Sequence, residues 1–588
     1  MGSKLEKFRE CIEEAGFDGF IIPREDRFQA EYVAPSDERL AWLTGFTGSA
    51  GQAIILKDKA AFFTDGRYTL QAKNQIQEAA YVQLNMPEDK PAEWVKQNAN
   101  SNQTLGFDPW LLTVTQLEAW SKKLERSELE LKPATRNPVD ALWHDKPDTE
   151  IKTAFVHPMK YAGKTHLDKL SRLAKTLENS NCDAVLLSCP ESIAWLLNIR
   201  GQDVEHVPVL HSFAVVNSRG EVDLFVDPGK IVDEVAKHLG SAVRIHEELE
   251  IVSFMQSFEG SIAIDPKQCP VAIFQEINPS CTVIKQQNPC LLPKAKKNWV
   301  EIEGSKEAHI YDGVALTKLL VWLSAQLKAK NQVSELDVSA KILELRQQQP
   351  NFKSASFATI AASGPNGAII HYLPNDETNR EINAKDLFLL DSGGQYLDGT
   401  TDVTRTVAYD PPSTSQRDHY TRVLKGHIAI ATARFPSSTS GGQLDGLARQ
   451  YLWEAGLDYA HGTGHGVGSY LSVHEGPQSL GKNSSVSLEP GMILSNEPGF
   501  YQPGSYGIRL ENLVYVTESA FRGADGKAFL EFETLTMVPF DLKLVDVQML
   551  SSHERNWLNA YHAKVRRVLL EHLDYTEQQW LIDSTPEI

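Results

Sequence analysis

Two stretches in the N-terminal half of the chain share one order of hydrophobic and polar segments. Each begins with a helical pattern, continues through a short apolar run (FDGFII from Phe17, CDAVLL from Cys182), and then reads AWLTGF or AWLLNI. Each ends in two strand-like runs joined by a charged turn, at residues 57–59 and 218–221. The shared order predicts two related α/β domains, with convergence of ordinary strand and turn patterns as the alternative.

The pattern changes at the segment NPCLLPKAKKNWVEIEG, residues 288–304, where two prolines and three lysines interrupt the periodicity. Beyond it, apolar residues at helical spacing predict a long helix over about residues 303–330. A capping box formed by Ser334 and Asp337 predicts a second helix. A third domain therefore begins here.

The third domain is expected to be rich in strands and glycine from Ser356 to about Val547, and helical again over its last forty residues. The aromatic residues of that last segment, Trp557, Tyr561 and Trp580, could dock on a neighbouring surface. The predicted domains are residues 1–155, 156–298 and 299–588, the last with a C-terminal helical extension.

Composition and charge restrict the possible functions. The 588 residues are 41% hydrophobic and 23% charged, as in ordinary globular proteins. The longest apolar stretches are too short to span a membrane. The net charge of -19 repels phosphate backbones and anionic lipids, so neither nucleic acid nor a membrane is an expected partner. Six cysteines without a CxxC pair, and no secretory pattern at the N-terminus, predict a cytoplasmic protein without disulfides or structural zinc.

Two aspartates lie in the segment LFLLDSGGQYLDGTTDVTRTVAY, residues 387–409. It is predicted to form two strands around a turn at Asp398, so that Asp391 and Asp402 face each other across a hairpin. Asp391 ends an apolar run, where a carboxylate is costly to bury unless it is neutralised. A bound cation would neutralise it, whereas for a lone aspartate in this position a turn cap is the alternative.

Further candidates strengthen the interpretation as a metal site. Glu497 ends one apolar strand and Glu511 lies inside another, while HGTGHGVGSYLSVH supplies His461, His465 and His474. The glycines around His461 and His465 disfavour a helical zinc pair, so only one of the two is expected to bind metal. Two aspartates, two glutamates and a histidine suit two divalent ions that share carboxylates, and favour manganese, cobalt or iron over a thiolate zinc site.

With these residues in place, the sequence resembles a known family. DSGGQYLDGTTDVTRT, AHGTGHGVGSYLSVHEGP, SNEPGFY and GIRLEN are similar to the signature segments of aminopeptidase P, the X-Pro aminopeptidases with the pita-bread metallopeptidase fold, in its three-domain cytosolic form. TGFTGSAG, TDGRY and SASFATIAASGPNGAIIHY also look like that type. The resemblance implies a fold of α/β and α+β character, with two creatinase-like N-terminal domains before a pita-bread catalytic domain.

The resemblance also implies roles for individual residues. Five residues match the ligands of a dimanganese centre in which two bridge the ions, Asp402 and Glu511, and three do not, Asp391, His465 and Glu497. The metals would be Mn²⁺, with Co²⁺, Fe²⁺ or Zn²⁺ as alternatives. Four further residues match non-ligand positions of the active site: His371, His461, His474 and Arg509. The family is usually homodimeric, so a homodimer is expected.

The implied reaction is hydrolysis of the bond between an N-terminal residue and a penultimate proline, with a hydroxide between the two metals as nucleophile. Glu497 would handle the proton of the bridging water, and His371 and His474 would polarise the carbonyl or stabilise the oxyanion. One alternative is a prolidase-type Xaa-Pro dipeptidase, which the extra N-terminal domain disfavours. Others are a metal-free hydrolase of the creatinase kind or a non-catalytic pita-bread peptide-binding protein, which the intact ligand set disfavours.

Overall fold

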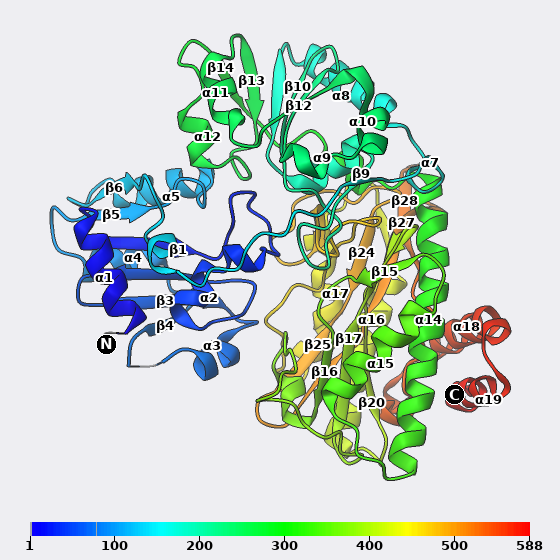
Figure 1. The fold of residues 1–588 in the computed structure, drawn as a ribbon. Coiled ribbons are helices and arrows are strands. Elements are labelled where there is room, and N and C mark those ends of the chain that lie inside the picture. The colour runs from blue at the N-terminus through cyan, green and yellow to red at the C-terminus, as the bar shows by residue number, and fades with distance from the viewer. Residues whose placement is uncertain (1–2, 78, 87) are drawn as a thin grey trace. The chain divides into compact units, whose positions relative to one another are not determined.

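The structure is a computed structural model that describes residues 3–77, 79–86 and 88–588 (Figure 1). The chain divides into two compact units. Unit 1 comprises Met1–Met159 and Lys164–Leu291, and unit 2 comprises Lys160–Gly163 and Leu292–Ile588.

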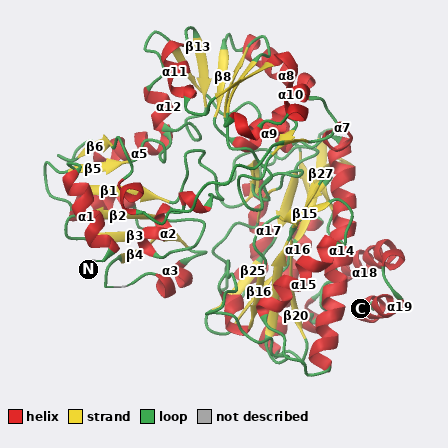
Figure 2. Ribbon diagram, viewed as in Figure 1, coloured by secondary structure: helices red, strands yellow, loops and turns green. Residues whose placement is uncertain are grey.

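Unit 1 contains two six-stranded sheets that are built alike (Figure 2). Their strand orders are β4-β3-β2-β1-β5-β6 and β12-β11-β10-β8-β13-β14. In both sheets, successive neighbours are parallel, antiparallel, antiparallel, parallel and parallel. This agreement confirms the prediction of two related α/β domains.

The strands of the first sheet are β1 (Gly19–Pro23), β2 (Gln52–Leu56), β3 (Ala60–Asp65), β4 (Val82–Met86), β5 (Thr104–Phe107) and β6 (Glu130–Pro133). Its helices are α1 (Lys4–Glu14), α2 (Arg39–Thr44), α3 (Thr69–Gln75), α4 (Pro91–Asn98), α5 (Val114–Leu124) and α6 (Pro138–Leu142). The strands of the second sheet are β8 (Ala184–Leu187), β10 (Phe213–Asn217), β11 (Val222–Phe225), β12 (Val243–His246), β13 (Ser261–Ile264) and β14 (Thr282–Lys285). Its helices are α8 (His166–Asn179), α9 (Pro190–Leu197), α10 (Asp233–Leu239), α11 (Glu250–Ser257) and α12 (Val271–Gln275).

The apolar runs of the central strands are explained by helices on both faces of each sheet. Along β1, Phe20 and Ile22 pack into one hydrophobic cluster with Phe8 of α1, whereas Ile21 packs into another with Val95 of α4. A strand buried on both faces has no polar face, so it appears in the sequence as a continuous apolar run.

Unit 2 carries the carboxylates and histidines singled out above. Its strands are β15 (Phe352–Ala355), β16 (Ile360–Ser363), β17 (Leu387–Ser392), β18 (Gly394–Tyr396), β19 (Gly399–Thr400), β20 (Val403–Ala408), β21 (Arg434–Pro436), β22 (Gly464–Gly466), β23 (Glu475–Leu480), β24 (Ile493–Asn496), β25 (Gly499–Gln502), β26 (Tyr506–Arg509), β27 (Asn512–Arg522) and β28 (Ala528–Thr534). They form sheets ordered β15-β18-β19, β16-β17-β20, β21-β28-β27-β24-β22-β23 and β25-β26.

The helices of unit 2 differ in detail from the prediction. The long helix is α14 (Trp299–Lys328), which starts four residues earlier than expected because the Asn298 side chain accepts hydrogen bonds from the backbone N–H groups of Val300 and Glu301. The second is α15 (Glu335–Gln347), which begins at the expected capping box. Leu316, Leu319 and Leu323 of α14 pack against the strands beside them.

Two helices were missed by the sequence analysis: α16 (Thr414–Ala431) and α17 (Gly441–Trp453), both inside the segment predicted to be rich in strands. The predicted C-terminal helices are present as α18 (Ser552–Leu569) and α19 (Tyr575–Ser584), and Trp557, Tyr561 and Trp580 pack against the hydrophobic core. Among the described residues, no helix combines the length and the apolar character that a membrane span requires.

Candidate metal centre

Asp391 and Asp402 come from two neighbouring strands, but not through the single hairpin that the sequence predicted. β17 pairs directly with β20, so that Asp391 lies opposite Thr404, and Asp402 immediately precedes β20. The turn at Asp398 belongs instead to the small hairpin β18–β19, which pairs in a different sheet. The two aspartates are 8% and 4% exposed, so both carboxylates are held away from water.

Glu497 and Glu511 are also presented by paired strands. Glu497 follows β24, Glu511 precedes β27, and the two strands pair with Asn496 opposite Asn512. Glu497 and Glu511 are therefore each adjacent to one residue of the same cross-strand pair. Glu511 is 1% exposed, and its Oε2 accepts a hydrogen bond of 2.7 Å from the Thr404 hydroxyl.

His465 lies on β22, which is a strand and not a helix, as the surrounding glycines predicted. Its Nδ1 is 2.9 Å from the Gly466 carbonyl oxygen, which can only accept, so Nδ1 carries the proton in the neutral ring. Nε2 then offers a lone pair. It lies 3.4 Å from Asp402 Oδ2 and 3.4 Å from Glu497 Oε1, so the imidazole and the two carboxylates face a common space in which a cation could bind them together.

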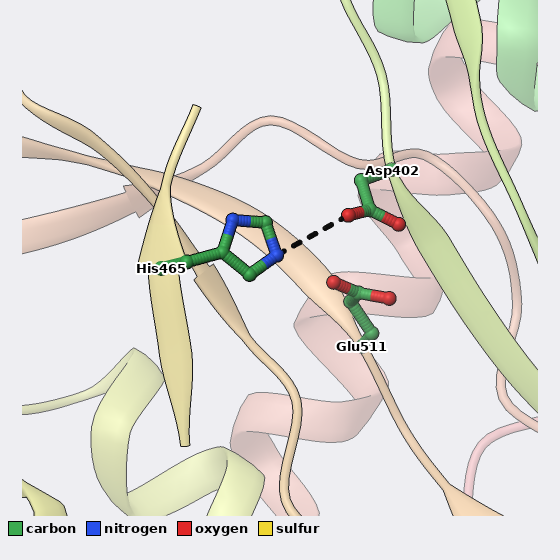
Figure 3. A group of neighbouring side chains, drawn as sticks. All are labelled: Asp402, His465 and Glu511. Atoms are coloured by element: carbon green, nitrogen blue, oxygen red, sulfur yellow. Dashed lines mark ion pairs between the residues drawn. The ribbon is translucent and has the colours of Figure 1, made fainter. Parts of the chain in front are cut away.

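Asp402, His465 and Glu511 each direct one ligand atom into a common space, with these atoms within 4.8 Å of one another (Figure 3). Figure 3 shows the three side chains converging from separate strands and loops. Asp391 and Glu497 lie outside this group of three. Glu497 contacts His465, a member of the group. Asp391 accepts a hydrogen bond from Arg509, which also donates one to Thr404.

The electrostatics of the cluster favour a bound cation. Burial, followed by repulsion from the neighbouring carboxylates, raises the pKa values of Asp402 and Glu511 well above their ordinary range. Burial also raises the pKa of Glu497, although His465 and Arg509 oppose the shift. Asp391 Oδ1 and Glu511 Oε1 are buried and, within the described part of the chain, have no hydrogen-bond partner. Hard oxygen donors without partners, beside an imidazole lone pair, fit divalent metal ions.

Arg509 lies at the end of β26 beside the cluster. Its guanidinium donates to Asp391 Oδ2 at 2.6 Å, to the Tyr501 hydroxyl at 2.7 Å and to Thr404 Oγ1 at 3.2 Å. Although burial alone would lower the pKa of Arg509, the neighbouring Tyr501, Asp391 and Glu497 raise it well above the ordinary value. Arg509 is thus a permanent cation that orients Asp391.

The three remaining histidines are half-buried and occupy different positions. The His474 ring packs edge-on against His465, with centroids 4.3 Å apart. His461 is joined to Arg509 through the Tyr501 hydroxyl, which lies 2.8 Å from His461 Nε2. His371 follows the 3₁₀ turn η4 (Gly364–Ala368), which packs against β26.

Two residues beside the cluster, Thr404 and Tyr501, support it and were not predicted from the sequence. Thr404 could have been found, because Asp402, Thr404 and Thr406 alternate along β20 and therefore share one face. Tyr501 had no such signal in the sequence.

His427 on α16 was also missed. Its Nδ1 lies 3.1 Å from the carbonyl oxygen of Asn496 and 3.2 Å from that of Leu510, the residues that precede the two glutamates. Burial lowers the pKa of His427 to about 3, so the ring is neutral and can hold the two strand ends together through one N–H group.

Comparison with known proteins identifies the class. The profile of metallopeptidase family M24 matches residues 303–518, and that of the C-terminal region of peptidase M24 matches residues 528–588. Two profiles of the creatinase/prolidase N-terminal domain match residues 4–142 and 145–301. The chain is therefore an M24 metallopeptidase, a hydrolase, with two creatinase-type domains before the catalytic domain.

Full-length relatives define the family more closely. Aminopeptidase P1 of Lotus japonicus is 39% identical over 97% of this chain and 97% of its own, and the probable Xaa-Pro aminopeptidase P of Ajellomyces dermatitidis is 38% identical over 100% and 99%. The crystal structure of an X-prolyl aminopeptidase from Caenorhabditis elegans, described as a cytosolic enzyme with a di-nuclear active site, has a TM-score of 0.95 and 34% identity over 100% of this chain and 99% of its own. The chain belongs to the aminopeptidase P family.

Proposed function

We propose that this protein hydrolyses the peptide bond between an N-terminal residue and a penultimate proline. The observation that carries the proposal is the unpartnered buried oxygen atoms of Asp391 and Glu511, close to the imidazole lone pair of His465 in a chain of the aminopeptidase P family. Such donors fit a metal centre rather than a peptide-binding groove without catalysis.

The proposed centre holds two divalent ions, Mn²⁺ by preference, with Co²⁺, Fe²⁺ or Zn²⁺ as alternatives. Asp391, Asp402, His465, Glu497 and Glu511 would hold the two ions. Bound there, the ions would lower the pKa of a nearby water and so supply the nucleophile at working pH.

The chain's own residues carry the other steps. Glu497 accepts the proton of the attacking water, because its carboxylate lies beside the other proposed ligands, with Oε1 3.4 Å from His465 Nε2. His371 and His474 donate to the carbonyl oxygen of the scissile bond as negative charge develops there. Arg509 keeps Asp391 oriented, and His461, held by Tyr501, lines the substrate site.

Proline directly after the scissile bond explains why a dedicated site is needed. The imide nitrogen of proline has no N–H group, and the ring fixes φ. A peptidase site that needs a hydrogen bond from the N–H group of the scissile bond therefore cannot form it with proline. We propose that the site is shaped for this ring and that the free N-terminal amine of the peptide aligns the first peptide bond.

The experiment compares Xaa-Pro-Yaa tripeptides, Xaa-Pro dipeptides, Xaa-Ala-Yaa tripeptides and N-acetylated Xaa-Pro-Yaa, with Glu497→Gln as the inactive control. Release of Xaa from the free Xaa-Pro-Yaa peptide alone supports the proposal. Preference for the dipeptide would favour the prolidase alternative, and no hydrolysis of any peptide by the metal-loaded protein would overturn the proposal.

We also propose the biological setting and the domain division. The C. elegans relative is described as cytosolic, which supports a cytoplasmic location, and a homodimer is proposed as the assembly. Peptides are the proposed partners, and the net charge of -19 argues against nucleic acid and membrane surfaces. The proposed boundaries remain residues 1–155, 156–298 and 299–588.

A further inference from the structure

Glu335, the first residue of α15, is fully buried and accepts five hydrogen bonds on its carboxylate. Oε1 accepts from the Ser363 backbone N–H at 2.7 Å and from Asn366 Nδ2 at 3.0 Å. Oε2 accepts from Asn366 Nδ2 at 3.0 Å, the Tyr372 hydroxyl at 2.7 Å and the Arg380 backbone N–H at 3.0 Å. Both oxygens therefore act as acceptors only.

The donors are neutral groups, and among the described residues Glu335 forms no ion pair. A buried carboxylate without a cation is costly unless hydrogen bonds satisfy both oxygens. The helix N-terminus at which Glu335 lies also favours its negative charge. The arrangement specifies a carboxylate, because an amide in its place would point an NH₂ group at other donors.

The five hydrogen bonds hold one loop. The donors lie at the beginning (Ser363 and Asn366), in the middle (Tyr372) and at the end (Arg380) of residues 363–380. Within this loop, described in full, the 3₁₀ turn η4 is the one regular element after the last residue of β16. The shape of the loop therefore depends on its hydrogen bonds to Glu335 of α15 rather than on strand pairing within the loop.

The same loop carries His371, the residue directly before Tyr372. It also lies close to the strand that carries Arg509. A Cβ atom on Gly507 of β26 would be 1.7 Å from the carbonyl oxygen of Gly367, so the loop and the strand touch backbone to backbone. A shift of the loop would therefore move His371 and disturb the contact with β26.

We propose that Glu335 is a positioning residue that sets the place of the His371 imidazole by gathering residues 363–380 onto the start of α15. The effect on catalysis rests on the proposed function, through the role of His371 there. The effect on the position of His371 does not.

The test uses Glu335→Gln, which keeps the shape of the side chain and removes one acceptor oxygen. Asp337→Asn is the matched control, because Asp337 caps the same helix by binding Ser334 and has no contact with the loop in the described hydrogen bonds. Tyr372→Phe removes a single donor and serves if Glu335→Gln does not fold. All variants are measured as full-length, metal-loaded protein, with metal content and thermal midpoint recorded.

The kinetic readout is a double-mutant cycle with His371→Ala. Glu335→Gln is expected to lower kcat by about 10- to 100-fold with unchanged metal content, while Asp337→Asn leaves it within about twofold. In the His371→Ala background, Glu335→Gln should add less than about threefold, because the residue that it positions is gone. If the fold-losses in kcat of the two single variants multiply in full in the double variant, the proposal is overturned.

The second readout does not need a substrate. Histidine-labelled protein gives imidazole NMR signals, and the His371 signal is assigned by its loss in His371→Ala. A shift or broadening of that signal in Glu335→Gln and Tyr372→Phe, but not in Asp337→Asn, supports the proposal. An unchanged His371 signal in folded Glu335→Gln overturns it. If wild-type protein hydrolyses no peptide, the proposed function fails while this readout still decides the role of Glu335.

Discussion

Arg509 donates a 2.6 Å hydrogen bond to Asp391 from a guanidinium that also contacts Tyr501 and Thr404. Because Thr404 in turn donates to Glu511, the arginine lies at the head of a network that reaches two of the proposed ligands. The network fixes the direction of the carboxylates before any metal arrives, and such preorganisation strengthens metal binding.

Arg509→Lys tests this network. An ammonium group keeps the charge, but its three N–H groups diverge from one nitrogen and cannot reproduce the planar fork with which three guanidinium nitrogens contact Asp391, Tyr501 and Thr404. We expect metal affinity or kcat/KM to fall by about 10- to 100-fold, measured by calorimetric metal titration and by peptide hydrolysis. Arg434→Lys, at an exposed pair with Glu531, is the control and should change neither. Unchanged affinity and activity in Arg509→Lys would show that Asp391 needs no orienting partner.

Removal of a ligand charge should abolish hydrolysis. Asp402→Asn and Glu497→Gln keep the side-chain shape but each takes one negative charge from a site built around two dications. We expect activity to fall by more than about a thousandfold, with less metal bound. Activity is measured after metal removal and controlled repletion, together with circular dichroism to confirm the fold. Hydrolysis near the wild-type rate by either variant would contradict the two-metal mechanism.

The two histidines in edge-on contact, His465 and His474, should separate metal binding from catalysis. His474→Ala should lower kcat by about 10²- to 10⁴-fold and leave metal content near normal, since its proposed role is towards the substrate. His465→Ala should lose metal, because its Nε2 is the proposed ligand atom. Metal content is measured by elemental analysis of dialysed protein. Normal turnover and an empty metal site in His474→Ala would reverse the two assignments.

Metal removal should destabilise the protein more at pH 8 than at pH 6. Burial and mutual repulsion raise the pKa values of Asp402 and Glu511, so in the metal-free folded state these groups stay protonated further up the pH scale than in the unfolded chain. The stability of the metal-free protein therefore falls as pH rises through the folded pKa values. Thermal midpoints with and without a chelator at the two pH values measure the effect. An equal loss at both pH values would contradict it.

The sequence predicted the parts of the site that are local. Acidic residues at the ends of apolar runs are conspicuous because burying a charge is costly, and all four proposed carboxylate ligands were found in this way. His465 could not be separated from His461 by spacing alone, since both lie among glycines. What separates them is the position of their ring nitrogens: Nε2 of His465 faces two carboxylates, whereas Nε2 of His461 faces the Tyr501 hydroxyl.

The parts that the sequence did not predict depend on contacts between distant segments. His427 contacts Asn496 and Leu510, which lie 69 and 83 positions further along the chain. A histidine in an amphipathic helix has no feature that indicates such a role. The pairing of β17 with β20 was hidden because β18 and β19 leave for another sheet between them. In unit 1, by contrast, the pattern of segments repeats along the sequence, and this repeat was enough to predict two related α/β domains, although not the strand order that their sheets share.

The last prediction concerns Asp26, a fully buried carboxyl group in unit 1. Its Oδ1 accepts from the backbone N–H groups of Phe28 and Ala30, but Oδ2 has no hydrogen-bond partner among the described residues. Burial raises the pKa of Asp26 from 3.8 to about 7. Its neighbour His211, 3.8 Å away, gives no compensating charge, because burial lowers the pKa of that imidazole to about 4.

Because the folded protein binds the Asp26 proton more tightly than the unfolded chain does, the contribution of this group to stability is present below about pH 4 and lost as pH rises to about 7. At 1.36 kcal/mol per pKa unit, the loss is at most about 4 kcal/mol. Asp26→Asn keeps the Oδ1 acceptor and cannot ionise, so it should be more stable than wild type at pH 8 and similar to it at pH 4. Urea unfolding at both pH values, followed in the full chain with Asp233→Asn as an exposed control, gives the comparison. A difference that does not grow with pH would mean that Asp26 is already ionised and satisfied in the folded protein.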